Sequence, residues 1–175
     1  MEYYELTQSG KVENPVELMG LDSAAYCLAM SWKDFDALDD MRVAYFSGNE
    51  AEELCDVLTT PTFLVSDRLK KLLSLYGKET EYKGIQFFPT SEESKQYPVY
   101  WVPYFPCQDC VHKSSTWYDN GMISSLVLDK NRIGGRDVFR LPGLLEYKII
   151  VSLLVAESIL RRRFYGIELR KMEVI

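Results

Sequence analysis

The segment 105–113, FPCQDCVHK, holds the residue types best suited to chemistry in this chain. Cys107 and Cys110 have the C-x-x-C spacing of a metal knuckle or a redox pair, and His112 is the single histidine of the sequence. A zinc ion could be held by these three side chains and a distant upstream cysteine. One C-x-x-C is a weak signal, because structural zinc sites normally pair two knuckles or a knuckle with two histidines.

Other chemistries fit this segment less well. A redox pair normally opens a helix, whose dipole lowers the pKa of the first thiol, but here proline precedes Cys107 and polar residues follow Cys110. Val111 interrupts the C-x-x-C-H pattern of haem attachment. Any histidine-activated nucleophile would need His112, and no G-x-S-x-G, G-x-x-x-x-G-K-[ST] or G-x-G-x-x-G motif occurs. The sequence therefore predicts no enzyme, no cofactor and no metal, with a small zinc- or thiol-dependent protein centred on Cys107, Cys110 and His112 as the alternative.

The acidic residues of the chain are concentrated in one segment. The 175 residues carry a net charge of −6, and segment 33–56 alone has eight acids against two basic residues, which accounts for all of it. The remainder is balanced, which disfavours nucleic acid as a partner, because phosphate binding needs a surplus of Lys and Arg. A basic protein partner is favoured instead.

Aromatic residues near the middle of the chain are candidates for interface anchors, because tight interfaces concentrate binding energy in Trp, Tyr and Arg. Tyr100, Trp101 and Trp117 are the candidates, although aromatic strands usually form core. The partner-binding residues predicted from the sequence are thus six acids and two tryptophans: Asp34, Asp36, Asp39, Asp40, Glu50, Glu53, Trp101 and Trp117.

Two segments are variations on one strand–helix–strand unit. TPTFLVSDRLKKLLSLYG is followed by GIQFFP, and YKIIVSLLVAESILRRRFYG is followed by IELRKMEV. Ser66 and Ser152 stand where a helix N-cap hydroxyl is expected, and apolar residues then recur at spacings of three and four. Gly77 and Gly166 are placed as the residues just beyond each helix.

The remaining segments predict further strands and one more helix. NEAEELCDVL is expected to be helical, and Pro98, Pro103 and Pro106 make the aromatic run YPVYWVPYFP an expected edge strand or irregular cover. An edge strand can pair with a second copy of the chain, so a homodimer is left open. YYEL, MRVAYFS, SSLVLD and DVFRL are the other expected strands. Together these elements predict one α+β domain over residues 1–175, with a mixed or antiparallel sheet, two or three helices and the two modules.

The order of motifs resembles bacterial immunity proteins of polymorphic-toxin systems, in particular a large group long known as a domain of unknown function. The resemblance is carried by FLVSDRLKKLLSLYG, IQFFP, the tyrosine-rich strand, LVLDKNRIGGRDVFRL and IIVS…GIELRKMEV. It covers about residues 60–175, after a variable acidic part at 1–59. Asp109-Cys110 is similar to a D-C-x-D pattern of that group, although His112 stands where the second acid is expected.

This resemblance implies stoichiometric neutralisation of a cognate toxin and carries no catalytic residues over to this chain. A generic scaffold or regulatory subunit is the other binding-protein alternative. The N-terminal MEYYELTQSG has no apolar signal region, and the apolar run 149–156 is shorter than the roughly 20 residues that span a bilayer. The sequence therefore predicts a cytoplasmic protein with reduced cysteines and no membrane partner.

Overall fold

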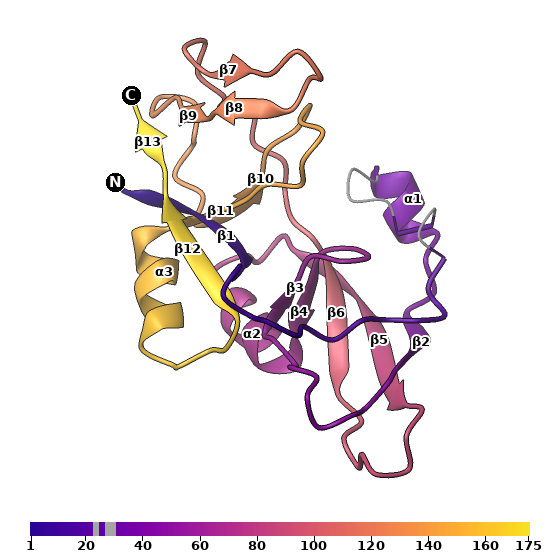
Figure 1. The fold of residues 1–175 in the computed structure, drawn as a ribbon. Helices are drawn as coiled ribbons and strands as arrows, with labels where there is room; N and C mark the ends of the chain where they lie inside the picture. Colours follow the sequence, from indigo (N-terminus) through magenta and orange to yellow (C-terminus); the bar gives the residue numbers. More distant parts are fainter. Residues whose placement is uncertain (23–24, 27–30) are drawn as a thin grey trace.

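The computed structural model describes residues 1–22, 25–26 and 31–175. Two sheets make up most of the fold (Figure 1). The two longer helices pack between them and contribute side chains to a core that both sheets share. The first sheet has the order β10-β11-β1-β12: Val138–Arg140, Ile149–Ser152, Tyr3–Gln8 and Ile167–Lys171. The second has the order β2-β5-β6-β4-β3: Met41–Phe46, Glu81–Pro89, Val99–Tyr104, Leu64–Ser66 and Val57–Leu58.

Smaller elements complete the described part of the chain. The helices are α1 (Trp32–Asp36), α2 (Asp67–Leu73) and α3 (Leu153–Leu160). Two short strand pairs are β7–β8 (Thr116–Trp117, Ile123–Ser125) and β9–β13 (Val127–Leu128, Glu173–Val174). Strand pairs are antiparallel except β2–β5 and β9–β13. The α+β class with mixed and antiparallel sheets is confirmed.

The two strand–helix–strand modules are confirmed as β4–α2–β5 and β11–α3–β12. In each, an antiparallel strand from elsewhere lies between the two module strands: β6 in the second sheet and β1 in the first. A short preceding strand pairs with each module in the same register, Val57 with Val65 and Val138 with Val151. The correspondence therefore extends over four strands and a helix in each half of the molecule.

An aspartate and a serine join the start of each module. Ser66 Oγ donates to Asp56 Oδ1 at 2.5 Å, and Ser152 Oγ donates to Asp137 Oδ1 at 2.6 Å. The Ser66 hydroxyl also accepts from the Leu69 amide at 3.2 Å, as expected for an N-cap. Ser152 occupies the N-cap position of α3, but its side chain makes no cap hydrogen bond. Its hydroxyl binds Asp137 instead.

The prediction that Gly77 and Gly166 directly follow the two helices is wrong. α2 ends at Leu73 and α3 at Leu160, so Gly77 and Gly166 lie in the connections that follow. Gly166 has φ +69°, and its missing Cβ leaves room for the Cys55 side chain of the other half. Its role is thus close packing between halves, which only glycine allows at this backbone conformation.

The tyrosine-rich strand is central, which corrects the expectation of an edge. β6 pairs with β5 on one side and with β4 on the other. Pro103 is tolerated because the pairing of β4 with β6 ends at Trp101, so the proline's missing amide falls beyond that ladder. β6 therefore provides no free edge for a second copy of the chain.

The helix expected at residues 49–58 is also wrong. The Asn49 side-chain oxygen accepts from the amides of Ala51 and Glu52, both at 3.0 Å, which fixes a turn in place of a helical start. Residues 55–58 are then all buried, and the last two form β3. Four consecutive buried residues suit a strand covered on both faces better than one face of a surface helix.

Three clusters of buried side chains fill the fold. The first joins α2 and α3 with Val57 and Val65 of one sheet and Val138 and Val151 of the other. The second cluster lies on the face of the second sheet that points away from the first cluster, and the third cluster lies on the corresponding face of the first sheet. The first cluster fixes the two halves on each other, and a hydrogen bond of 2.6 Å between the hydroxyls of Tyr76 and Ser158 adds a polar contact.

Candidate partner-binding surfaces

Four of the predicted acids gather around α1 and the start of β2. Asp34 and Ser31 form a capping box at the start of α1, and the Ser31 hydroxyl and amide hold the pKa of Asp34 below its usual value. Asp39 pairs with Arg42, and Asp40 pairs with Lys83, each at 2.6 Å. Asp36 is exposed on α1. This corner of the molecule presents carboxylates to solvent even though two of them have a cationic neighbour.

The other two predicted acids lie elsewhere. Glu50 is exposed in the turn that follows β2, at the far end of that strand. Six strand residues separate the two ends, which corresponds to roughly 20 Å. Glu53 is half-buried, and its carboxylate accepts from the Asn14 amide at 3.0 Å and from the Tyr165 hydroxyl. The structure thus brings Asp34, Asp36, Asp39 and Asp40 together and places Glu50 and Glu53 apart from them.

The predicted aromatic anchors differ in exposure. Trp117 is 48% exposed on the β7–β8 pair. Trp101 is half-buried, its indole donates to Asp67 at 3.0 Å, and the Lys70 ammonium lies 3.5 Å from its ring centre. Tyr100 is buried and its hydroxyl donates to the Cys55 carbonyl at 2.6 Å, so the expectation that it is an exposed anchor is wrong. Burial raises the pKa of this phenol.

The cysteines and histidine of segment 105–113 do not converge. Cys107 is exposed, Cys110 is fully buried, and His112 Nδ1 lies 2.7 Å from the Ser114 hydroxyl. Within residues 1–22, 25–26 and 31–175, no group of three or more potential ligands could hold a metal ion. Cys27, one of the upstream cysteines, lies outside the described residues. Burial, with a smaller contribution from Asp109, raises the pKa of Cys110 to about 11, which disfavours the thiolate that metal binding and redox exchange require.

The cysteines are expected to differ sharply in reactivity toward iodoacetamide. Cys55 and Cys110 are buried and both have a pKa raised to about 11, so at pH 8 about one molecule in a thousand would carry either thiolate. Cys107 should be alkylated in the folded protein, and Cys55 and Cys110 only after unfolding. Peptide mass mapping with and without urea checks this, and Cys107→Ser serves as the control. Fast alkylation of Cys110 in the folded protein would contradict it.

An exposed apolar surface on the second sheet was missed by the sequence reasoning. Met41, Val43 and Tyr45 of β2 are between 42% and 50% exposed, and Phe88 and Tyr97 are 37% and 56% exposed. We call these five residues the open face. The signal for it is present in MRVAYF, where apolar residues occupy both alternating positions of a strand that should show one polar face.

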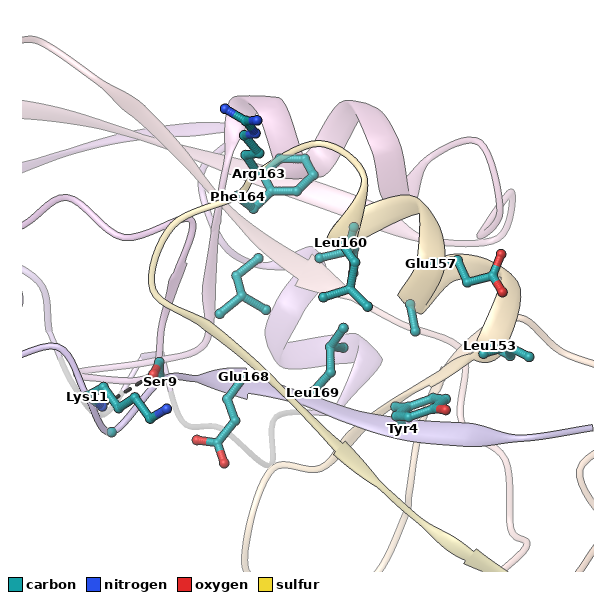
Figure 2. Close-up of a pocket in the computed structure, with 14 residues that line it drawn as sticks. Tyr4, Ser9, Lys11, Leu153, Glu157, Leu160, Arg163, Phe164, Glu168 and Leu169 are labelled. Carbon is teal, nitrogen blue, oxygen red and sulfur yellow. Dashed lines mark hydrogen bonds between the residues drawn. The ribbon is translucent and has the colours of Figure 1, made fainter.

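A groove of about 690 Å³ runs between α3 and the strands β1 and β12 (Figure 2). Figure 2 shows Leu160, Phe164 and Leu169 along its length. Charged groups of both signs line it: Lys11 and Arg163 are basic, and Glu157 and Glu168 are acidic. A groove with this mixture does not select a partner by net charge.

Comparison with known proteins assigns the chain to a family. A family model described as Immunity protein family (Imm11) matches residues 7–174, which includes the acidic N-terminal part as well as both modules. No curated protein matches the chain. None of the helices in the described part of the chain is long and apolar enough to cross a membrane. The chain belongs to the Imm11 family of immunity proteins.

Proposed function

We propose that this protein protects its cell by binding a cognate bacterial toxin in a one-to-one complex in the cytoplasm, without chemical turnover. The observation that carries this proposal is the family match over residues 7–174. An immunity protein of a polymorphic toxin system needs a surface that fits one toxin domain. The enzymatic activity belongs to the toxin, and the immunity protein blocks it by binding. The proposed partner surface includes the acids around α1 and the start of β2.

The physical character of the chain fits a blocking role. Many toxin domains that act on nucleic acid carry basic clefts, and a negatively charged inhibitor is attracted to such a cleft before contact. The net charge of −6 gives this protein that attraction. The joined core of the two halves gives it a preformed shape, which lowers the entropy cost of binding.

The first test is complex formation with the C-terminal domain of the protein encoded directly upstream of this chain's gene. We expect the two to co-purify, to give a binding stoichiometry near one by calorimetry, and co-expression to restore growth of cells that produce the toxin domain. Calorimetry with an unrelated toxin domain is the control. Failure of co-expression to restore growth, together with no heat of binding, would contradict the proposed function.

A further inference from the structure

The open face lies on the part of the second sheet that α2 leaves uncovered. Met41, Val43 and Tyr45 alternate along β2 and therefore point to the same side. Their partners on β5 are Gly84, Gln86 and Phe88, which point to that side as well. The Tyr45 and Phe88 ring centres are 6.5 Å apart, and those of Phe88 and Tyr97 are 5.7 Å apart. The exposed side chains thus form one continuous surface.

The two faces of this sheet have different environments. The far side of β2 and β5 is buried, with Ala44, Phe46, Ile85 and Phe87 in the second core cluster. On the near side, α2 covers the half formed by β3, β4 and β6 through Val57, Val65 and the partly buried Trp101. The Met, Val, Phe and Tyr side chains of the open face, on the uncovered part of this sheet, are between 37% and 56% exposed. Exposed apolar surfaces of this kind mark interaction sites, and Tyr, Phe and Met are enriched there.

Both ends of the open face are acidic. Asp39 and Asp40 directly precede β2, and the latter is 97% exposed even though it pairs with Lys83. At the other end, Glu50 and Glu93 line one hollow of about 390 Å³. Segments 36–50 and 88–97 together hold six acids and two basic residues, a formal charge of −4. The apolar surface is therefore bordered by negative charge at either end of β2.

This charge pattern decides between two kinds of occupant. A second copy of the chain on the open face would bring acidic ends against acidic ends in either orientation, which opposes association. A partner with an apolar patch between Lys or Arg residues would meet complementary charge at both ends, roughly 20 Å apart along the six residues of β2. We propose that the open face is the docking surface for the toxin, which contacts it with apolar side chains flanked by basic residues. This inference rests on the proposed function and names its contact surface.

The direct test truncates the face. The double variant Tyr45→Ala/Phe88→Ala is expected to weaken binding of the upstream-encoded toxin domain about 100-fold, mainly through faster dissociation, because apolar anchors at the centre of an interface carry most of its energy. The matched control is Leu154→Ala/Leu160→Ala on α3, which removes two apolar side chains that are 55% and 70% exposed and should leave the affinity unchanged. Surface plasmon resonance gives both rates, and thermal melting confirms that each variant is folded.

A second variant tests the acidic end. Replacement of Asp36, Asp39 and Asp40 with lysine is expected to slow association about tenfold at low salt and to flatten its salt dependence. If the Tyr45→Ala/Phe88→Ala variant binds the toxin domain as well as the wild-type protein does, the open face is not the docking surface. The proposed function would still stand. Loss of binding in the α3 variant alone would move the site to the groove and overturn the proposal. A wild-type dimer that dissociates on Tyr45→Ala would overturn it in favour of a second copy.

Discussion

Replacing Asp56 with alanine is expected to destabilise the folded protein by about 3–4 kcal/mol, because hydrogen bonds to a charged group contribute about 1.5–3 kcal/mol each. Asp56 is 8% exposed, and its carboxylate accepts from Ser66 Oγ at 2.5 Å and from the Tyr165 amide at 2.7 Å. Arg68 lies 3.3 Å from the same carboxylate. The substitution removes all three contacts and leaves the Tyr165 amide without this acceptor.

The chain provides a matched control at the corresponding place of the other half. Asp137 binds Ser152 Oγ at 2.6 Å just as Asp56 binds Ser66, but Asp137 is half-buried, and this hydrogen bond stays within one half of the molecule. Asp137→Ala should therefore cost about 1–2 kcal/mol, which is the value of one charged hydrogen bond at a less buried site. Urea unfolding followed by circular dichroism measures both. Equal losses would show that the contact to Tyr165 contributes nothing and would contradict the prediction.

Much of the fold could be predicted from local sequence signals. V-S at a strand end, followed by apolar residues at spacings of three and four, identified α2 and α3 and both modules. Asp119-Asn120-Gly121 has the composition of a tight turn, and Gly121 adopts φ +83° between β7 and β8. These features depend on residues close together in the chain, so a single sequence contains them.

The errors arise where distant residues decide the structure. β6 is central only because β4 and β5 pair with its two edges, and the prolines of the segment indicate the opposite. Tyr100 belongs to an aromatic strand in either case, but its burial depends on Cys55 and Phe87. The 49–58 segment has helical composition, yet the partner strand β4 and the Asn49 turn override that propensity.

The candidate site shows the same division between local and distant information. The acids Asp34, Asp36, Asp39 and Asp40 are neighbours in sequence, so their gathering at one corner follows from proximity along the chain. The open face joins β2 with β5, about forty residues apart in sequence, and adds Tyr97 from the following connection. Chemical groups and aromatic runs are visible in a single sequence, whereas the exposure of the apolar strand β2 is determined by the order of strands in the sheet.

Replacing Gly166 with alanine is expected to destabilise the protein by about 3–4 kcal/mol, the combined cost of an L residue in the left-handed region and of overpacking. Gly166 has φ +69°, and a Cβ there would lie 2.5 Å from both Cβ and Sγ of Cys55. Cys55 is fully buried, so it has little room to move away. The added methyl group would push apart the two halves close to the point where the Asp56 carboxylate accepts a hydrogen bond from the Tyr165 amide.

Gly135→Ala separates the two costs. Gly135 has φ +72°, almost the same backbone conformation, but nothing lies within 4 Å of a Cβ placed there. Its substitution should cost only the conformational part, about 1–2 kcal/mol. The difference between the two variants in urea unfolding therefore measures the close approach of Gly166 to Cys55. If Gly166→Ala is no more destabilising than Gly135→Ala, the halves can move apart freely and the preformed shape assumed for toxin binding would lose its support.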